Sequence, residues 1–324
     1  MITRRALVAA TAAATAAGAA PASAQTFPAK PVRIAMPYPA GTGPDVVQRV
    51  INEKLSQRWS QPVTVENRPG ANGWTAVEAV KRAAPDGHTL LQTDNLQFGL
   101  QPFVFRRLPF EFQDFEPVAG IYQTHYFVTV AANSPWTNVA DLIAAARARN
   151  GALTYGSSGV ASHMHLGGVM LEGANNVRMT HVPVRDTPQV FVAIANGELG
   201  WAFGSPATTG PMYRAQRVKY LAISAPTRHP NFPNVPTVRE AGGPPDFELK
   251  AWIALFAPRG TPRPVADRIN AEVTQLLPDP EVRERLSSLG VLPWAVSPEQ
   301  LSQTVRDDQR VFGELARRER ISLD

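Results

Sequence analysis

The sequence predicts an α/β fold of two lobes, and three observations indicate it. Short apolar segments alternate with segments whose apolar residues recur every three or four positions, as strands and helices do. This alternation runs through the first hundred residues and resumes after two extended apolar segments. The chain has 324 residues, 30 prolines and 23 glycines, which fits about two domains with many short turns.

The first unit begins with a strand at Val32–Met36 that leads into a proline- and glycine-rich turn. Asp45 is expected to cap the following helix, whose apolar residues recur every four positions from Val47 to Trp59. The other elements of this unit are a strand at Val63–Glu66, a helix around Ala76, Val77 and Val80, and a strand at Thr89–Gln92. The βαβαβ order indicates a mostly parallel sheet with helices on its faces.

Two further strands, Val118–Tyr122 and Phe127–Ala131, separate this unit from a second one. The second unit comprises helices at Val139–Ala148, Ser162–Leu171 and Gln189–Ala195 and strands at Leu153–Gly156, Met179–Pro183, Leu199–Phe203 and Tyr220–Ser224. An almost fully apolar strand follows at Leu249–Ala257. Three helices with proline near their starts complete the chain, at Pro264–Leu277, Pro280–Leu289 and Pro298–Arg318.

The first residues indicate export. Arg4 and Arg5 precede an alanine-rich apolar segment, and Ala22-Ser23-Ala24 has the small-x-small pattern of a signal-peptidase site. The apolar segment is too short to span a bilayer of about 30 Å as a permanent anchor. We therefore expect residues 1–24 to be a signal peptide cleaved near Ala24, and the mature protein to be periplasmic. The paired arginines fit twin-arginine and ordinary secretory export equally well.

Composition excludes several classes of function. The chain has no cysteine, which excludes disulfides, thiolate catalysis and cysteine-bound metals. Its formal net charge is +5 at pH 7, and the basic residues are scattered rather than clustered with aromatic residues. This distribution does not indicate a nucleic-acid partner.

A loop between the first strand and helix, Pro39–Asp45, is suited to bind an anion. Its glycines let the backbone approach a ligand, and the N–H groups of the helix start favour a carboxylate or phosphate. The loop lacks both the Gly-Lys-Ser/Thr of a phosphate-binding loop and the third glycine of the dinucleotide fingerprint. We therefore expect no cofactor here; an ordinary tight turn is the alternative interpretation. Its candidate ligand-binding residues are Ala40, Gly41, Thr42 and Asp45.

A second loop of the same design, Tyr155–His163, precedes a helix of the second unit. It offers backbone donors and the hydroxyls of Ser157, Ser158 and Ser162. The Gly-x-Ser-x-Gly pattern of hydrolases fails, because Val160 stands at the second glycine. Ser162 and His163 are adjacent on a helix and diverge, which makes a poor nucleophile–base pair. His163 and His165 likewise point to different helix faces, so we expect neither catalysis nor a metal.

These two loops, together with many short blocks in the right order, resemble one family. From Pro31 almost to the C-terminus, the chain resembles the periplasmic binding proteins of tripartite tricarboxylate transporters, often called the Bug family. The blocks that show the resemblance are Pro37–Arg49, Val65–Gly73, Ala84–Leu90, Tyr155–Leu166, His181–Pro183, Val235–Gly242 and Trp252–Pro262.

The resemblance implies a type-II periplasmic binding protein fold with a ligand cleft between two α/β lobes. Lobe 1 would comprise residues 25–126 plus 251–324 and lobe 2 residues 127–250, with hinges near Gln123–Phe127 and Lys250–Ile253. It also implies that the two loops clamp the carboxylate ends of an extended acid, partly through water. The implied positions are Ala40, Gly41 and Thr42 on one side, Ser157, Gly159 and Ser162 on the other, and Thr93, Asp94 and Asn95 after the third strand.

Several residues differ from the family pattern, and these differences limit what the pattern indicates about the ligand. Thr42 and Ala161 replace usual glycines, and Arg185 follows the His-Val-Pro block. Gly200 replaces a frequent aspartate, and the loss of this carboxylate argues against recognition of an amine in the manner of family members that bind amino acids. Arg185 is a candidate for pairing a ligand carboxylate bidentately, and an ion pair with Asp186 is the alternative. Trp74 and Tyr38 are candidates for stacking on an aromatic acid, although Trp74 would equally pack the first lobe.

Asp94 is the departure with the most consequence, because a carboxylate repels an anionic ligand unless it is protonated, paired or bound to a ligand cation. We favour the interpretation that it faces solvent or caps a turn. The expected protein is a monomer that binds a small carboxylate by lobe closure and delivers it to a membrane permease. A protein that presents its ligand to a membrane sensor is the alternative, and a secreted hydrolase is a weaker one.

Overall fold

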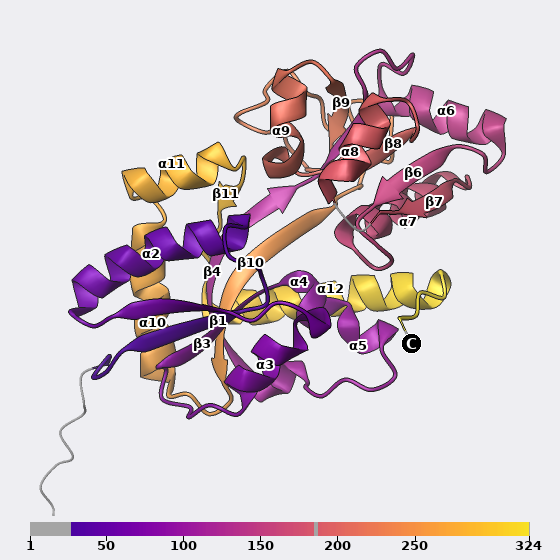
Figure 1. Cartoon of the computed structure of the whole chain (residues 1–324). Helices are drawn as coiled ribbons and strands as arrows, with labels where there is room; N and C mark the ends of the chain where they lie inside the picture. The colour runs from indigo at the N-terminus through magenta and orange to yellow at the C-terminus, as the bar shows by residue number, and fades with distance from the viewer. Residues whose placement is uncertain (1–26, 185–186, 324) are drawn as a thin grey trace, which may run out of the picture.

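The computed structural model describes residues 27–184 and 187–323, and these form two lobes that each contain one sheet (Figure 1). One sheet has six strands in the order β11-β4-β10-β3-β1-β2, and the other has five in the order β7-β6-β8-β5-β9. The strands of the second sheet all lie between residues 127 and 223. The expected signal peptide and Arg185 lie outside the described residues.

The six-stranded sheet contains the predicted βαβαβ unit. Strand β1 (Val32–Met36) pairs in parallel with both β2 (Val63–Asn67) and β3 (Thr89–Asp94). Helices α2 (Gly43–Trp59) and α3 (Trp74–Lys81) make the connections, and the short helix η1 (Ala71–Gly73) precedes α3. On the other side of β3, strand β10 (Lys250–Pro258) runs antiparallel to β3 and to β4 (Phe115–His125), and β11 (Leu292–Pro293) completes the sheet.

The remaining helices of this lobe cover its sheet and its lower edge. They are α4 (Asn95–Gly99), α5 (Gln101–Val104), η2 (Phe112–Asp114), α10 (Arg263–Leu276), α11 (Pro280–Ser288) and α12 (Pro298–Arg318). The three predicted C-terminal helices are confirmed, and each has proline at its first or second position. Ile34, Ile51, Ile269 and Val273 are fully buried where α2 and α10 pack on the sheet, and this burial positions β1 and β3 rigidly.

The five-stranded sheet forms the core of the other lobe. Its strands are β5 (Phe127–Ala131), β6 (Thr154–Ser157), β7 (Thr180–Pro183), β8 (Trp201–Gly204) and β9 (Val218–Ile223). Its helices are α6 (Val139–Arg149), α7 (His163–Asn175), α8 (Thr187–Ala195) and α9 (Pro206–Arg214). Strands β6, β7 and β8 pair in parallel, whereas β5 runs antiparallel to β8 and β9. Trp201 and Phe203 are fully buried at its centre.

Two local predictions need correction. Asp45 does not cap α2: the N-cap is Thr42, and Asp45 lies in the first turn with its side chain buried. Its carboxylate accepts hydrogen bonds from Gly41 N at 2.9 Å and Asn67 Nδ2 at 2.8 Å, so it holds the loop against β2. Helix α9 was not predicted, because an internal proline, Pro211, and the composition of its segment are typical of a turn.

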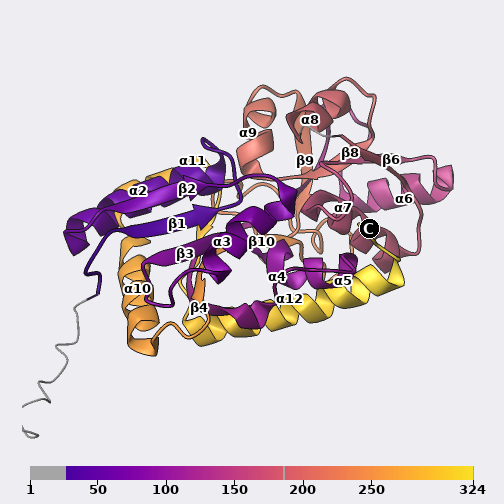
Figure 2. The same cartoon turned by 60° about the horizontal axis from the view of Figure 1, so that its bottom comes forward.

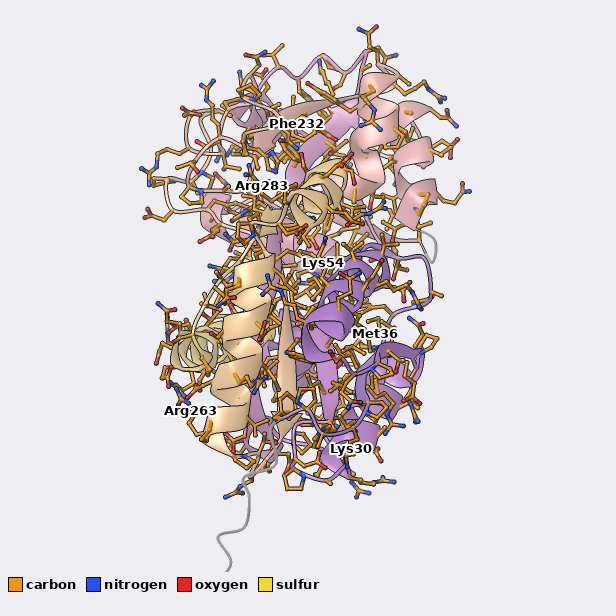
Figure 3. The ribbon with its side chains drawn as sticks, turned by 90° about the vertical axis from the view of Figure 1, so that its left-hand side faces the viewer. Lys30, Met36, Lys54, Phe232, Arg263 and Arg283 are labelled. Atoms are coloured by element: carbon orange, nitrogen blue, oxygen red, sulfur yellow. The ribbon has the colours of Figure 1, made fainter. Side chains whose placement is uncertain are left out.

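Helix α12 runs along lobe 1 and reaches lobe 2, as the turned view shows (Figure 2). Its residues Phe312 and Leu315 pack in one apolar cluster with Leu166 and Val169 of α7 and with Leu100 of lobe 1. On the opposite side of β4 and β10, the crossing strands that run toward lobe 2, Asn231 of lobe 2 donates from Nδ2 to the Ser287 carbonyl of α11 at 3.2 Å. Figure 3 shows Arg283 of α11 between Phe232 of lobe 2 and Lys54 of α2. The lobes therefore touch on both sides of the strands that join them.

Within the described residues, no helix has both the length and the apolar character needed to cross a membrane.

Candidate ligand-binding cleft

A cavity of about 250 Å³ lies between the two lobes. Its lining comes from the start of α2, the end of β3, the strands β4 and β10, the starts of α7 and α9, and the turn before β11. The lining residues are Tyr38, Gly43, Pro44, Asp94, Tyr122, Thr124, Tyr126, His163, Ser205, Ala207, Thr208, Ala251, Ile253, Leu289 and Val291. Its volume is below the range of about 300–1,000 Å³ that is usual for drug-sized ligands, so it suits a smaller molecule.

Three helices of the two lobes begin at this cavity. Helix α2 has Thr42 as its N-cap, α7 has Ser162 and α9 has Ser205, and residues from the first turn of each helix line the cavity. The N–H groups at a helix start present partial positive charge and favour an anion. None of the described lining residues is a lysine or arginine. An anion in this part of the cleft would therefore be held mainly by helix starts and hydroxyl groups.

A larger cavity of about 410 Å³ also takes its lining from both lobes, but its surroundings are different. It is lined by the second halves of α7 and α12 and by the segment Pro244–Phe247. Asp246 and Glu314 line it, no helix of the described residues begins there, and Arg318 is its one cationic lining residue. The smaller cavity, where three helices begin, is therefore the better candidate for an anion site.

The first predicted loop reaches the cavity only at its end. Gly43 and Pro44 line the cavity, whereas Ala40 and Gly41 are exposed and Thr42 is half-buried. The Thr42 hydroxyl donates to the Pro39 carbonyl at 2.7 Å. In this conformation, Ala40, Gly41 and Thr42 shape the start of α2 and do not line the cavity themselves.

In the second predicted loop, the hydroxyls of Ser157 and Ser162 bond to protein groups and do not line the cavity. The fully buried Ser157 has its Oγ 2.6 Å from His181 Nε2 and accepts a hydrogen bond from Gly159 N at 3.0 Å. Ser162 Oγ donates to the Gly159 carbonyl at 2.7 Å and caps α7 at His165 N. Ser158 and Gly159 are half-buried beside them, and only His163 of this region lines the cavity.

Asp94 both caps a helix and lines the cavity. One carboxylate oxygen accepts from Leu96 N at 3.0 Å at the start of α4. Tyr38, Tyr122 and Tyr126 surround the same cavity. Burial raises the pKa of each of these phenols, and the charge of Asp94 adds to the effect, so all three are neutral at physiological pH.

Two hydroxyls beside Asp94 have no hydrogen-bond partner in the described structure: Tyr38 Oη and Thr93 Oγ1. The Thr93 side chain is fully buried. Tyr38 lies close enough to Asp94 and Thr93 for its pKa to respond to both, but its hydroxyl is not aligned for a hydrogen bond with either. Polar atoms buried without a partner are uncommon. Tyr38 lines the cavity and Thr93 does not, so only the Tyr38 hydroxyl is placed to meet a ligand there.

Asn95 and His163 connect the lobes at the edge of the cavity. The fully buried Asn95 places its Oδ1 2.8 Å from His163 Nε2 of lobe 2, and its Nδ2 donates to the Lys250 carbonyl at 3.2 Å. The His163 ring stacks on Tyr126 with 5.6 Å between the centroids. Burial lowers the pKa of His163, and Asp94 only partly opposes this effect, so the ring is neutral at pH 7.

The other predicted residues lie elsewhere. Trp74 does not line the cavity: its Nε1 donates to Gln101 Oε1 at 2.8 Å, and its ring meets Phe105 edge-on. Asp45 is buried against Arg49 and Asn67. The sequence did not predict Tyr122 or Tyr126, because Tyr122 lies in the apolar strand β4 and Tyr126 between β4 and β5. It did not predict Ser205 or Thr208, because they are the N-cap and a first-turn residue of the unpredicted helix α9.

The described residues offer little for catalysis or metal binding. They contain no group of three or more histidine, aspartate or glutamate side chains placed to hold a metal ion. The short contact between Ser157 and His181 has the composition of a nucleophile–base pair, but Ser157 is fully buried and its Oγ is also bonded to Gly159. No substrate could reach that oxygen in this conformation.

Comparisons with known proteins agree with a binding role. The model of the family described as "Tripartite tricarboxylate transporter family receptor" matches residues 47–320. A Pseudomonas sp. (strain P51) protein, described as the UPF0065 protein in the tcbD-tcbE intergenic region, is 33% identical over 283 residues, covering 87% of this chain and 84% of the relative.

Two solved structures are similar over nearly their whole length. Rpa4515 of R. palustris with adipate has a TM-score of 0.78 and 27% identity, covering 90% of this chain and 97% of its own. MatC of Rhodopseudomonas palustris with bound malate has a TM-score of 0.74 and 30% identity, covering 89% and 99%. Because the family model covers most of the sequence and these structures share its two-lobed fold, the chain belongs to the receptor family of the tripartite tricarboxylate transporters, whose members bind solutes and are not enzymes.

Proposed function

We propose that this receptor captures a small carboxylate between its lobes in the periplasm and delivers it to a permease of the tripartite tricarboxylate transporter type. The observation behind the proposal is the convergence of three helix starts, from α2, α7 and α9, on one cavity. Helix starts bind anions without a charged side chain. The adipate and malate named for the two similar structures are carboxylates of this kind.

The proposed mechanism is closure of the lobes around the acid. Lobe 1 contributes the start of α2 and lobe 2 contributes the starts of α7 and α9, so neither lobe binds the ligand well alone. Bending would occur near Gln123–Phe127 and Lys250–Ile253, where β4 passes into β5 and the chain returns along β10. With bending at these two places, lobe 1 would comprise residues 25–126 plus 251–324 and lobe 2 residues 127–250.

The remaining parts of the proposal concern the protein before and after binding. Cleavage near Ala24 would release a mature chain that acts as a monomer in the periplasm. A ligand that is held by both lobes stabilises the closed form, and the closed form is what a permease would recognise. No cofactor is needed for this role.

Thermal-shift and calorimetric measurements on the processed protein, purified from the periplasm of an expressing host, test the proposal. The ligands are mono-, di- and tricarboxylates, aromatic acids, amino acids, sugars and metal cations. We expect at least one carboxylate to raise the melting temperature and to reduce the radius of gyration in small-angle scattering, as closure requires. Stabilisation by sugars or metal cations alone would show that the cleft does not bind anions.

A further inference from the structure

We propose that Asp94 and the tyrosines around it bind a cationic group of the ligand, so that the preferred ligand is a carboxylate that also bears an ammonium group. This inference rests on the proposed function and adds a second subsite to the same cleft. The helix starts would hold the carboxylate, and Asp94 would hold the ammonium.

Asp94 is the only acidic or basic side chain among the described lining residues apart from the neutral His163. Only one of its oxygens has a hydrogen bond, from Leu96 N, and no ion pair to Asp94 occurs within the described part of the chain. Lys250, the nearest lysine along the crossing strand, pairs with Glu248 instead, at 3.4 Å. A second carboxylate placed beside Asp94 would be repelled, whereas an ammonium group would be attracted.

The aromatic lining supports the same ligand chemistry. Tyr38, Tyr122 and Tyr126 face the cavity that Asp94 lines, and their faces carry the negative potential that attracts a cation. A carboxylate combined with aromatic rings binds ammonium groups better than it binds a second anion.

A hydroxyl without a hydrogen-bond partner provides an independent observation. Tyr38 lines the cavity together with Asp94, and its Oη is buried without a partner in the described structure. A hydroxyl oxygen accepts hydrogen bonds, and an ammonium group has three donors and no acceptor. The Asp94 oxygen that accepts no hydrogen bond and the Tyr38 hydroxyl would therefore accept from two of the three donors of one ammonium group. A metal ion fits less well, because no further acidic side chain of the described residues lines the cavity.

The test compares four closely related acids. Glutarate, 2-hydroxyglutarate and glutamate differ only in the group on the second carbon, and 4-aminobutyrate replaces one carboxylate of glutarate by an ammonium group. Calorimetry at pH 7.5 gives the Kd of each for the wild type, for Asp94→Asn and for Asp246→Asn. Asparagine keeps the capping bond to Leu96 N. Asp246→Asn removes one charge from a side chain that is 93% exposed and lies outside the cavity, so it is the matched control.

We expect the wild type to bind one of the amino compounds at least tenfold more tightly than glutarate and 2-hydroxyglutarate. A hydrogen bond to a charged group contributes about 1.5–3 kcal/mol, so Asp94→Asn should weaken that ligand about ten- to 150-fold. The variant should bind glutarate more tightly than the wild type does, and Asp246→Asn should match the wild type.

Three results would overturn the inference. If glutarate or 2-hydroxyglutarate binds the wild type best, the cleft does not select a cation. If Asp94→Asn leaves the ratio of Kd values unchanged, Asp94 does not contact the ligand. In both cases carboxylate binding, and with it the proposed function, would stand. If no carboxylate or amino acid binds, in these compounds or in the wider ligand series, the proposed function fails together with the inference.

Discussion

The hydrogen bond between Asn95 and His163 crosses the cleft, and Asn95→Ala should therefore weaken ligand binding more than it destabilises the unliganded protein. In the structure, Asn95 Oδ1 lies 2.8 Å from His163 Nε2. His163 lines the cavity, and Asn95 follows the lining residue Asp94 in the chain. Asn95 is fully buried, so water does not readily replace its amide. The substitution leaves His163 Nε2 without its partner.

The expected changes in Kd and in stability follow from these contacts. A buried polar group that loses its partner costs about 1–3 kcal/mol. If the bond forms only when the lobes are close, this cost applies to the liganded, closed state, and the Kd rises about 5- to 150-fold. The bond from Asn95 Nδ2 to the Lys250 carbonyl lies along the crossing strand and adds a smaller loss of general stability, about 1 kcal/mol.

The control is Asn270→Ala. Asn270 Nδ2 donates to the carbonyls of Val118 and Val296, each at 2.8 Å, and all three residues belong to lobe 1. Its loss should lower the melting temperature of the unliganded protein without changing the Kd. Calorimetry with the best ligand of the carboxylate series and melting curves without ligand measure both quantities. If the two variants change the Kd equally, or if Asn95→Ala changes only the melting temperature, the bond does not contribute to closure.

Two further predictions concern pH and the closeness of the lobes. Burial and the neighbouring His181 lower the pKa of His165 to about 4, so the folded state keeps this ring neutral while the unfolded chain protonates it near 6.5. The free energy of unfolding should therefore fall by up to about 3 kcal/mol as the pH drops from 6.5 to 4. His165→Gln should flatten this part of the profile of melting temperature against pH. An unchanged profile would show that His165 does not cause the pH dependence. Gly290→Ala places a methyl group in steric conflict with Pro206 Cβ of the other lobe and should raise the Kd and the radius of gyration of the liganded protein. Gly260→Ala is the control, because Gly260 also has a positive φ, +85° against +62° at Gly290, and a methyl group there would meet no atom closer than 4.0 Å. It should lower stability by about 1 kcal/mol and leave the Kd unchanged. Equal Kd values for the two variants would exclude the steric argument.

Much of the fold was predictable because its signals are local. The four-residue recurrence of Val47, Ile51 and Leu55 predicted the buried face of α2, and proline followed by an amphipathic segment predicted α12 at its observed bounds. Helix α9 was missed because a threonine-, glycine- and proline-rich segment has weak helical propensity; Ser205 and tertiary packing stabilise it.

The binding cleft was only partly predictable. Gly43, Pro44 and His163 lie in or beside the predicted loops, and Tyr38 and Asp94 line the cavity as candidates. The hydroxyls of Ser157 and Ser162 were expected to face the ligand, yet Ser157 bonds to Gly159 and to His181 of β7, and Ser162 bonds to Gly159. Composition identifies a donor but not its partner, because that partner is set by loop conformation.

The sequence by itself determined the family and the two α/β units, and it predicted that two strand-to-helix loops favour an anion. These properties depend on residues that are close together along the chain. The tertiary structure decided which side chains share one cavity: it brings the third helix start, the tyrosines of the crossing strands and Asp94 together from distant segments. It also decided the environment of Asp94, because the partners of a charge depend on which lobe folds over it, and no local pattern records that contact.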